Sequence, residues 1–252
     1  MPRVLMIGFE NNIHKLLKKE LDPESVIEAC GTGQWGLSAI GSFKPDVIVV
    51  DSRVPDMDPM RLIRTIRFGD RRIGIMLITS LLNEVVCIQA EELRINKLVV
   101  KPYRMETIAS HIYEIMQALA SPETKRWWLE EDVDILLSDL GFRAGPERNR
   151  ITREVILAVF DGDLDMLMKQ AYIEVSAKYK GSIDRIEKAL RDAIHSAWLS
   201  GNRGIWNTYF PGPAGKTEKS PTNETFVVTI VENLKRRQRR IENRNNQPFD
   251  TI

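Results

Sequence analysis

The chain contains few of the residues that build disulfide frameworks, metal centres or nucleophilic active sites. Its two cysteines, Cys30 and Cys87, stand in apolar surroundings without metal-ligand spacing, and its three histidines, His14, His111 and His195, fall on separate predicted helices. These absences argue against a disulfide scaffold, a zinc site and an enzyme, and favour a cytoplasmic protein. No apolar run approaches the length that spans a bilayer, so we expect no membrane association.

An excess of charge of one sign is also lacking. The chain of 252 residues has 36 Lys and Arg against 35 Asp and Glu, with 43% hydrophobic and 28% charged residues. These values are typical of a soluble globular protein long enough for two ordinary domains. The neutral total conceals one basic run, "KRRQRR", from Lys235 to Arg240.

Residues 2–119 alternate short apolar runs with amphipathic stretches. Five strand–helix pairs in this order predict a parallel sheet with helices on both faces. The runs "DVIVVD" and "IGIMLI" are almost wholly apolar, which indicates buried central strands. The run "SVIEAC" is more polar and is expected at an edge of the sheet.

After "SPETKRWW" the strand pattern stops, and the chain reads as helices to about residue 242. Pro122 is expected to end the helix that precedes it. We therefore expect an α/β domain over 1–120, a linker over 121–127, an all-α domain over 128–245 and a tail over 246–252.

Three polar side chains stand at the ends of successive predicted strands: Asp51, Thr79 and Lys101. Ligands bind at the carboxyl ends of strands in open parallel sheets. A carboxylate can attack phosphorus there, while a hydroxyl and an ammonium bind the phosphoryl oxygens. The pattern therefore indicates a phosphoryl-handling site.

With this pattern, residues 2–119 resemble the receiver domain of bacterial response regulators. The resemblance implies a flavodoxin-like fold, with Asp51 as phosphoacceptor, Thr79 as switch hydroxyl and Lys101 as the family's lysine. It also implies an acidic pair after the first strand that holds Mg²⁺, and those positions are Gly8 and Phe9 here.

Without the acidic pair too few anionic ligands remain for a hard cation. We therefore expect an atypical receiver, phosphorylated poorly or not at all, with no cofactor and with Asp51 paired to Lys101. One alternative stays open: Glu10, together with Asp51, holds Mg²⁺ and the domain remains phosphorylation-dependent.

Two glycine motifs offer competing interpretations. "GTGQWG", from Gly31 to Gly36, has the dinucleotide-binding spacing, but it follows the predicted edge strand and leaves Thr79 and Lys101 unexplained. "GPAGKT", from Gly212 to Thr217, lacks both the first glycine and the preceding strand of a Walker A loop. A NAD-dependent enzyme is thus a rival to the receiver interpretation, and a P-loop is not expected.

The stretch "VSAKYKGSIDRIEKALRDAIHSAW" has a helix-turn-helix pattern, with a turn through Gly181 and a second helix capped by Ser182 or Asp184. Its second helix places Ile186, Ala189, Leu190, Ala193, Ala197 and Trp198 on one face, which should be core. The other face carries Arg185, Lys188, Arg191, Asp192 and His195, where a recognition helix would meet DNA.

From about Trp128 to Arg240, the order of these segments, including "AWLSGN" and "SPTNETFVVTIVENL", resembles the effector domain of the stage 0 sporulation protein A family. The resemblance implies a six-helix DNA-binding domain that reads head-to-tail promoter boxes. The positions it assigns to DNA contact are Arg185, Glu187, Lys188 and Arg191. The run from Lys235 to Arg240 either contacts phosphates or is a solvated helix end.

The sequence thus predicts a DNA-binding transcriptional regulator of the sporulation type. Its expected partners are double-stranded promoter DNA, a second copy of the chain, and a phosphorelay or regulatory protein. The rival of another class is a protein-binding modulator that docks on, or dimerises with, a true family member. Arg185, Lys188 and Arg191 favour the DNA-binding interpretation, because a decoy has no need of them.

Overall fold

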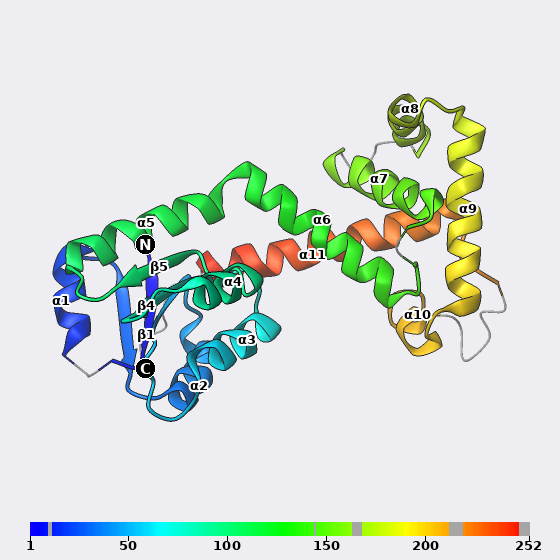
Figure 1. Ribbon diagram of the computed structural model, residues 1–252. Coiled ribbons are helices and arrows are strands. Elements are labelled where there is room, and N and C mark those ends of the chain that lie inside the picture. Colours follow the sequence, from blue (N-terminus) through cyan, green and yellow to red (C-terminus); the bar gives the residue numbers. More distant parts are fainter. Residues whose placement is uncertain (10–11, 144, 163–167, 212–218, 247–252) are drawn as a thin grey trace. The chain divides into compact units, whose positions relative to one another are not determined.

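Figure 1 shows a computed structural model of the chain, which describes residues 1–9, 12–143, 145–162, 168–211 and 219–246, of 240–246 the backbone alone. The chain divides into two compact units between Lys125 and Arg126, and each is described by itself. Within the described ranges, no helix is long and apolar enough to cross a membrane.

The first unit alternates strands and helices, as the sequence predicts. The strands are β1 (Arg3–Ile7), β2 (Val26–Cys30), β3 (Val47–Asp51), β4 (Gly74–Thr79) and β5 (Lys97–Val100). The helices are α1 (Ile13–Glu20), α2 (Gly33–Phe43), α3 (Pro59–Gly69), α4 (Glu84–Glu92) and α5 (Met105–Ala120).

The strands form one parallel sheet in the order β2-β1-β3-β4-β5. Every residue of β3 and β4 is buried, which confirms that they are central strands. Strand β2 pairs only with β1, and Val26 at its start is 37% exposed, so the predicted edge position is confirmed. This is the flavodoxin-like arrangement.

Side-chain alternation along β1 shows why helices cover both faces. Val4 and Met6 pack into a cluster with residues of α1 and α5, whereas Leu5 and Ile7 pack into a second cluster with residues of α2 and α3. Successive residues of a strand point to opposite faces, so an almost wholly apolar strand needs cover on both.

The helices of the second unit are α6 (Pro122–Asp139), α7 (Glu147–Asp161), α8 (Met168–Tyr179), α9 (Ile183–Ser200), α10 (Arg203–Tyr209) and α11 (Asn223–Asn246). The first turn of α6 lies before the unit boundary. The described part of this unit thus has the six helices that the family resemblance implies. Periodicity missed α10, because seven residues are too few to show a helical repeat.

The boundary between the two units falls inside the predicted linker over 121–127, and this segment is helical from Pro122 onward. Helix α5 ends at Ala120, and Pro122 is the first residue of α6. Proline is favourable at that position, since its missing N–H would have no partner in the helix. The Ser121 hydroxyl accepts a hydrogen bond from the Thr124 amide and caps the new helix. Residues 247–252 of the predicted tail lie outside the described residues.

Trp206 of α10 lies at the centre of the core of the second unit. Its side chain is fully buried, and its indole N–H donates to the Leu140 carbonyl at 2.9 Å. Its ring lies 5.0 Å from Trp198, 5.4 Å from Phe210 and 5.9 Å from Phe226, measured between ring centroids. These contacts join α6, α9, α10 and α11.

We expect Trp206→Ala to destabilise the second unit by about 3–5 kcal/mol, because it opens a cavity and leaves a buried carbonyl unpaired. The matched control is Leu199→Ala on α9, whose side chain is 67% exposed and which should cost less than about 0.5 kcal/mol. Urea unfolding followed by tryptophan fluorescence and circular dichroism measures both losses. Equal losses would contradict this account of the core.

Candidate functional site

The sheet brings the predicted phosphoryl-handling residues to one edge. Asp51 ends β3, Thr79 ends β4, and Lys101 follows the last residue of β5. The register pairs Asp51 with Ile78 and Thr79 with Val100, so the three strands end side by side. This convergence is the geometry that parallel strands impose.

Asp51 and Lys101 form a buried ion pair. Lys101 Nζ lies 2.5 Å from Asp51 Oδ2, and the two side chains are 17% and 8% exposed. The Arg53 backbone amide donates to Asp51 Oδ1 at 2.9 Å. Burial raises the pKa of the Tyr103 phenol, and the negative charge of Asp51 raises it further. The carboxylate is therefore compensated by side-chain and backbone donors of the chain itself.

Thr79 is buried beside this pair, but its hydroxyl is engaged elsewhere. Oγ1 donates to the Leu81 carbonyl at 2.9 Å and accepts from the Leu81 amide at 3.1 Å. The structure therefore brings Asp51 and Lys101 into contact and leaves Thr79 bonded to its own loop.

Gly8 has backbone geometry that excludes a carboxylate at the first position of the acidic pair. Its φ is +86°, in the region that favours glycine, and its amide donates to the Cys30 carbonyl at 2.8 Å. A Cβ added there would lie 2.9 Å from Val54 Cγ2 and 3.2 Å from Asp51 Cβ. A side chain at this position would require the Val54 side chain to shift and would hold the backbone in a strained conformation.

Phe9 fills the second position with an apolar side chain. It is 5% exposed and belongs to the core cluster that also contains Leu17 of α1 and Ile108 of α5. Glu10, the predicted substitute ligand, lies outside the described residues. In the ranges that the structure describes, no group of three or more acidic, histidine or cysteine side chains is placed to hold a metal ion. The described residues by themselves therefore do not make a magnesium site.

The "GTGQWG" motif forms the start of α2, but its amides already have an anionic partner. The Asp56 carboxylate accepts hydrogen bonds from the Gly33 amide at 2.7 Å and the Gln34 amide at 2.9 Å. These bonds lower the pKa of Asp56. A Cβ at Gly36 would lie 2.5 Å from the Ile7 side chain. The geometry thus supports a capped, closely packed helix and gives no support to a pyrophosphate site.

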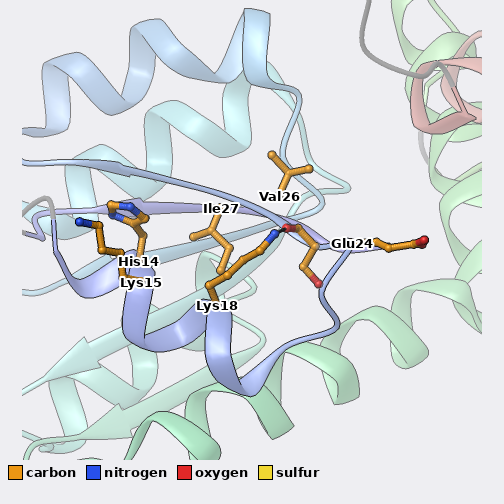
Figure 2. Close-up of a pocket in the computed structure, with 7 residues that line it drawn as sticks. His14, Lys15, Lys18, Glu24, Val26 and Ile27 are labelled. Carbon is orange, nitrogen blue, oxygen red and sulfur yellow. Dashed lines mark hydrogen bonds between the residues drawn. The ribbon is translucent and has the colours of Figure 1, made fainter. Parts of the chain in front are cut away.

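A groove of about 460 Å³ lies between α1 and the start of β2 (Figure 2). It is lined by His14, Lys15, Lys18, Glu24, Ser25, Val26 and Ile27. The Lys18 ammonium donates to the Ser25 carbonyl. None of these residues belongs to the Asp51 cluster, so the groove and the phosphoacceptor position are separate features. The segment "GPAGKT" lies outside the described residues.

The helix-turn-helix of the second unit consists of α8 and α9. Lys180 takes the left-handed conformation at φ +49°, and the Gly181 amide closes the end of α8 on the Ser176 carbonyl at 3.0 Å. The left-handed residue of the turn is therefore Lys180, not glycine. Ser182 then caps α9 by accepting from the Arg185 amide at 3.2 Å, which decides between the two predicted caps. Asn223 of α11 donates both to the Tyr172 hydroxyl of α8 and to the Glu187 carbonyl of α9.

One face of α9 is anchored in the core, and the opposite face is open to solvent. The buried residues are Ile186, Leu190, Ala193, Ile194, Ala197 and Trp198, so the prediction missed Ile194 and overstated Ala189, which is half-buried. Arg185, Lys188, Arg191, Asp192 and His195 are exposed as expected, while Glu187 is intermediate. A core-anchored helix thus presents three cations on one exposed face.

Two of these cations are paired with carboxylates. Arg191 Nη2 lies 2.6 Å from Glu187 Oε1, one turn away on α9. Arg185 Nη2 lies 3.1 Å from both carboxylate oxygens of Glu147, at the start of α7. Sequence reasoning missed Glu147, because it precedes Arg185 by 38 residues and no local pattern links them. In the described part of the chain, Lys188 has no carboxylate partner.

The basic run from Lys235 to Arg240 lies inside α11, which continues to Asn246, and it divides into engaged and exposed cations. Lys235 donates to the Gly162 carbonyl at 3.3 Å, and Arg237 lies 3.7 Å from the Asp132 carboxylate. Arg236 and Arg239 are exposed, and the side chain of Arg240 lies outside the described residues. Part of this run therefore stabilises the unit itself.

Comparison with known families identifies both units. Residues 7–113 match the response regulator receiver domain, so the chain is a response regulator. Residues 135–234 match the family described as sporulation initiation factor Spo0A C terminal. Together the two matches span most of the chain, which therefore belongs to the Spo0A-like response regulators, with a receiver followed by a sporulation-type DNA-binding domain.

Solved structures with similarity to the first unit are receivers. A CheY-like receiver domain protein from Methanospirillum hungatei JF-1 is 17% identical, with 47% of this chain and 96% of that chain covered and a TM-score of 0.44. The chemotaxis response regulator CheY4 of Vibrio cholerae is 19% identical, with coverage of 46% and 98% and a TM-score of 0.41. The response regulator DrrB of Thermotoga maritima is 19% identical, with coverage of 47% and 54% and a TM-score of 0.42.

We expect Lys101→Met to destabilise the first unit by about 3 kcal/mol, because it leaves the buried Asp51 carboxylate with only the exposed Arg53, 3.9 Å away, as a cation. The control is Lys97→Met, also on β5, whose Glu114 partner and own side chain are 47% and 36% exposed. This change should have little effect, since exposed pairs are weak. Urea unfolding measures both; similar losses from the two variants would show that Asp51 does not depend on Lys101.

Proposed function

We propose that the chain is a sequence-specific DNA-binding transcriptional regulator whose receiver acts without phosphorylation of Asp51. The observation that carries the DNA-binding part is the exposed cationic face of α9. Arg185, Lys188 and Arg191 project from a helix whose opposite face is buried, at the second position of a helix-turn-helix. Such a helix inserts into the major groove, where arginine bonds the guanine edge.

The geometry at Gly8 and Phe9 supports the second part of the proposal. Phosphoryl transfer to a carboxylate needs a metal or comparable cations to neutralise the developing charge. Here the loop packing at Gly8 leaves no room for a carboxylate, and Phe9 is buried in the core. Asp51 then acts as the ionic partner of Lys101 and holds β3 and β5 together at their ends.

A signal other than phosphate then has to act on the receiver. A surface for it is offered by the exposed apolar side chains of Leu81, Leu82, Val85 and Ile88, which are 50–62% exposed before and along α4. A clustered apolar surface of this kind marks a protein interaction. The second candidate function, a modulator that binds another regulator or a second copy of the chain, rests on this surface.

Fluorescence anisotropy of the full-length protein on a duplex with a head-to-tail pair of family-type promoter boxes tests the DNA-binding part. We expect Arg185→Ala to weaken binding to the box by roughly five- to hundredfold and to relax sequence preference, because a bidentate contact to a base is lost. Lys19→Ala on α1, which is also exposed and removes one positive charge, should change binding little.

Equal effects of the two variants would contradict recognition by α9. Absence of binding to any promoter box, together with capture of a second regulator by the α4 surface, would favour the modulator instead.

A further inference from the structure

Glu147 is the first residue of α7 and lies outside the helix-turn-helix, yet its carboxylate is bonded to the recognition helix. Both of its carboxylate oxygens lie 3.1 Å from Arg185 Nη2. The two side chains are 49% and 52% exposed. Exposed ion pairs contribute little to stability, so this contact has little effect on the fold. Its effect is instead on how Arg185 binds DNA.

The carboxylate engages only one end of the guanidinium. Arginine carries five N–H donors in a rigid plane, and two of them suffice for a guanine edge. Among the described residues, Glu147 is the one acceptor bonded to the Arg185 guanidinium, so the Nη1 and Nε donors stay available. Glu147 thereby fixes the direction of the plane without occupying the donors that a base requires.

The carboxylate of Glu147 opposes non-specific binding by the cations around it. Arg148 and Arg150 follow it on α7 and are exposed, as is Arg185. A carboxylate among these cations repels the phosphate backbone, which supplies most of the affinity of non-specific binding. If Arg185 turns to a phosphate it leaves Glu147, and the freed carboxylate then faces the DNA backbone. If Arg185 bonds a base edge, it keeps Glu147 as a partner.

We propose that Glu147 is a specificity-determining positioning residue, which presents Arg185 to base edges and penalises its use as a phosphate contact. The inference rests on the proposed DNA-binding function and names a residue of α7 that controls it. Glu147 touches no base itself; it acts through Arg185. Its removal should therefore change discrimination between DNA sequences more than it changes affinity for the correct one.

The experiment compares full-length wild type with Glu147→Gln on two duplexes of equal length, one with the promoter box and one scrambled, by anisotropy at several salt concentrations. We expect Glu147→Gln to tighten binding to the scrambled duplex and to lower the ratio of the two affinities by about fivefold, a fraction of the discrimination that a bidentate base contact gives. The charge control is Asp139→Asn, exposed near the end of α6, which should leave the ratio unchanged.

Repeating the comparison in an Arg185→Ala background separates positioning from a general electrostatic effect. The inference requires that Glu147→Gln no longer changes the ratio there. If Glu147→Gln changes the ratio of the two affinities equally with and without Arg185, the inference is overturned. It is also overturned if the wild type prefers the box and Glu147→Gln alone leaves the ratio unchanged. A wild type that binds both duplexes alike would overturn the proposed function and this inference together.

Discussion

The first unit depends on how the buried carboxylate of Asp51 is neutralised. Lys101 Nζ lies 2.5 Å from this carboxylate, and the exposed Arg53 Nε lies 3.9 Å away. Gly8 makes that arrangement difficult to reverse, because its left-handed backbone packs directly against Val54 and Asp51. The space beside Asp51 is therefore filled both by the packing of Gly8 against Val54 and by the ion pair with Lys101. A receiver built in this way keeps the parallel sheet, with glycine and phenylalanine at the two positions of the acidic pair.

In the second unit, a comparable dependence links the core to the exposed cationic face of α9. Trp206 joins four helices, and Asn223 of α11 bonds both α8 and α9. Helix α9 is therefore held from its buried side by several other helices of the unit. Its exposed side is then free to be adjusted by single contacts, of which the pair between Glu147 and Arg185 is one. A binding side chain is held precisely when its helix is rigid and a neighbouring group fixes its orientation.

Much of this could be predicted from the sequence, for identifiable reasons. The sequence pattern alone predicts three of these features. They are the apolar central strand β3, the more polar edge strand β2 and the buried face of α9. The strand-end positions of Asp51 and Lys101 follow from the rule for parallel sheets. Other features depend on contacts between distant segments. Neither the bond from Thr79 to Leu81, nor Asp56 at the start of α2, nor Glu147 against Arg185 has a local pattern. The short helix α10 was missed because seven residues are too few to show a helical repeat. The helix that begins at Pro122 was missed because proline is also common just after the end of a helix.

The measurement that tests the account most directly is the affinity of the full-length protein for a promoter box with and without magnesium and beryllium fluoride, which mimic a phosphorylated aspartate. The closed site at Gly8, Phe9 and Lys101 predicts equal, salt-sensitive binding in both conditions. Tighter binding with the mimic would contradict it, and would mean that Glu10 completes a metal site beside Asp51 and that the receiver is a working phosphorylation switch.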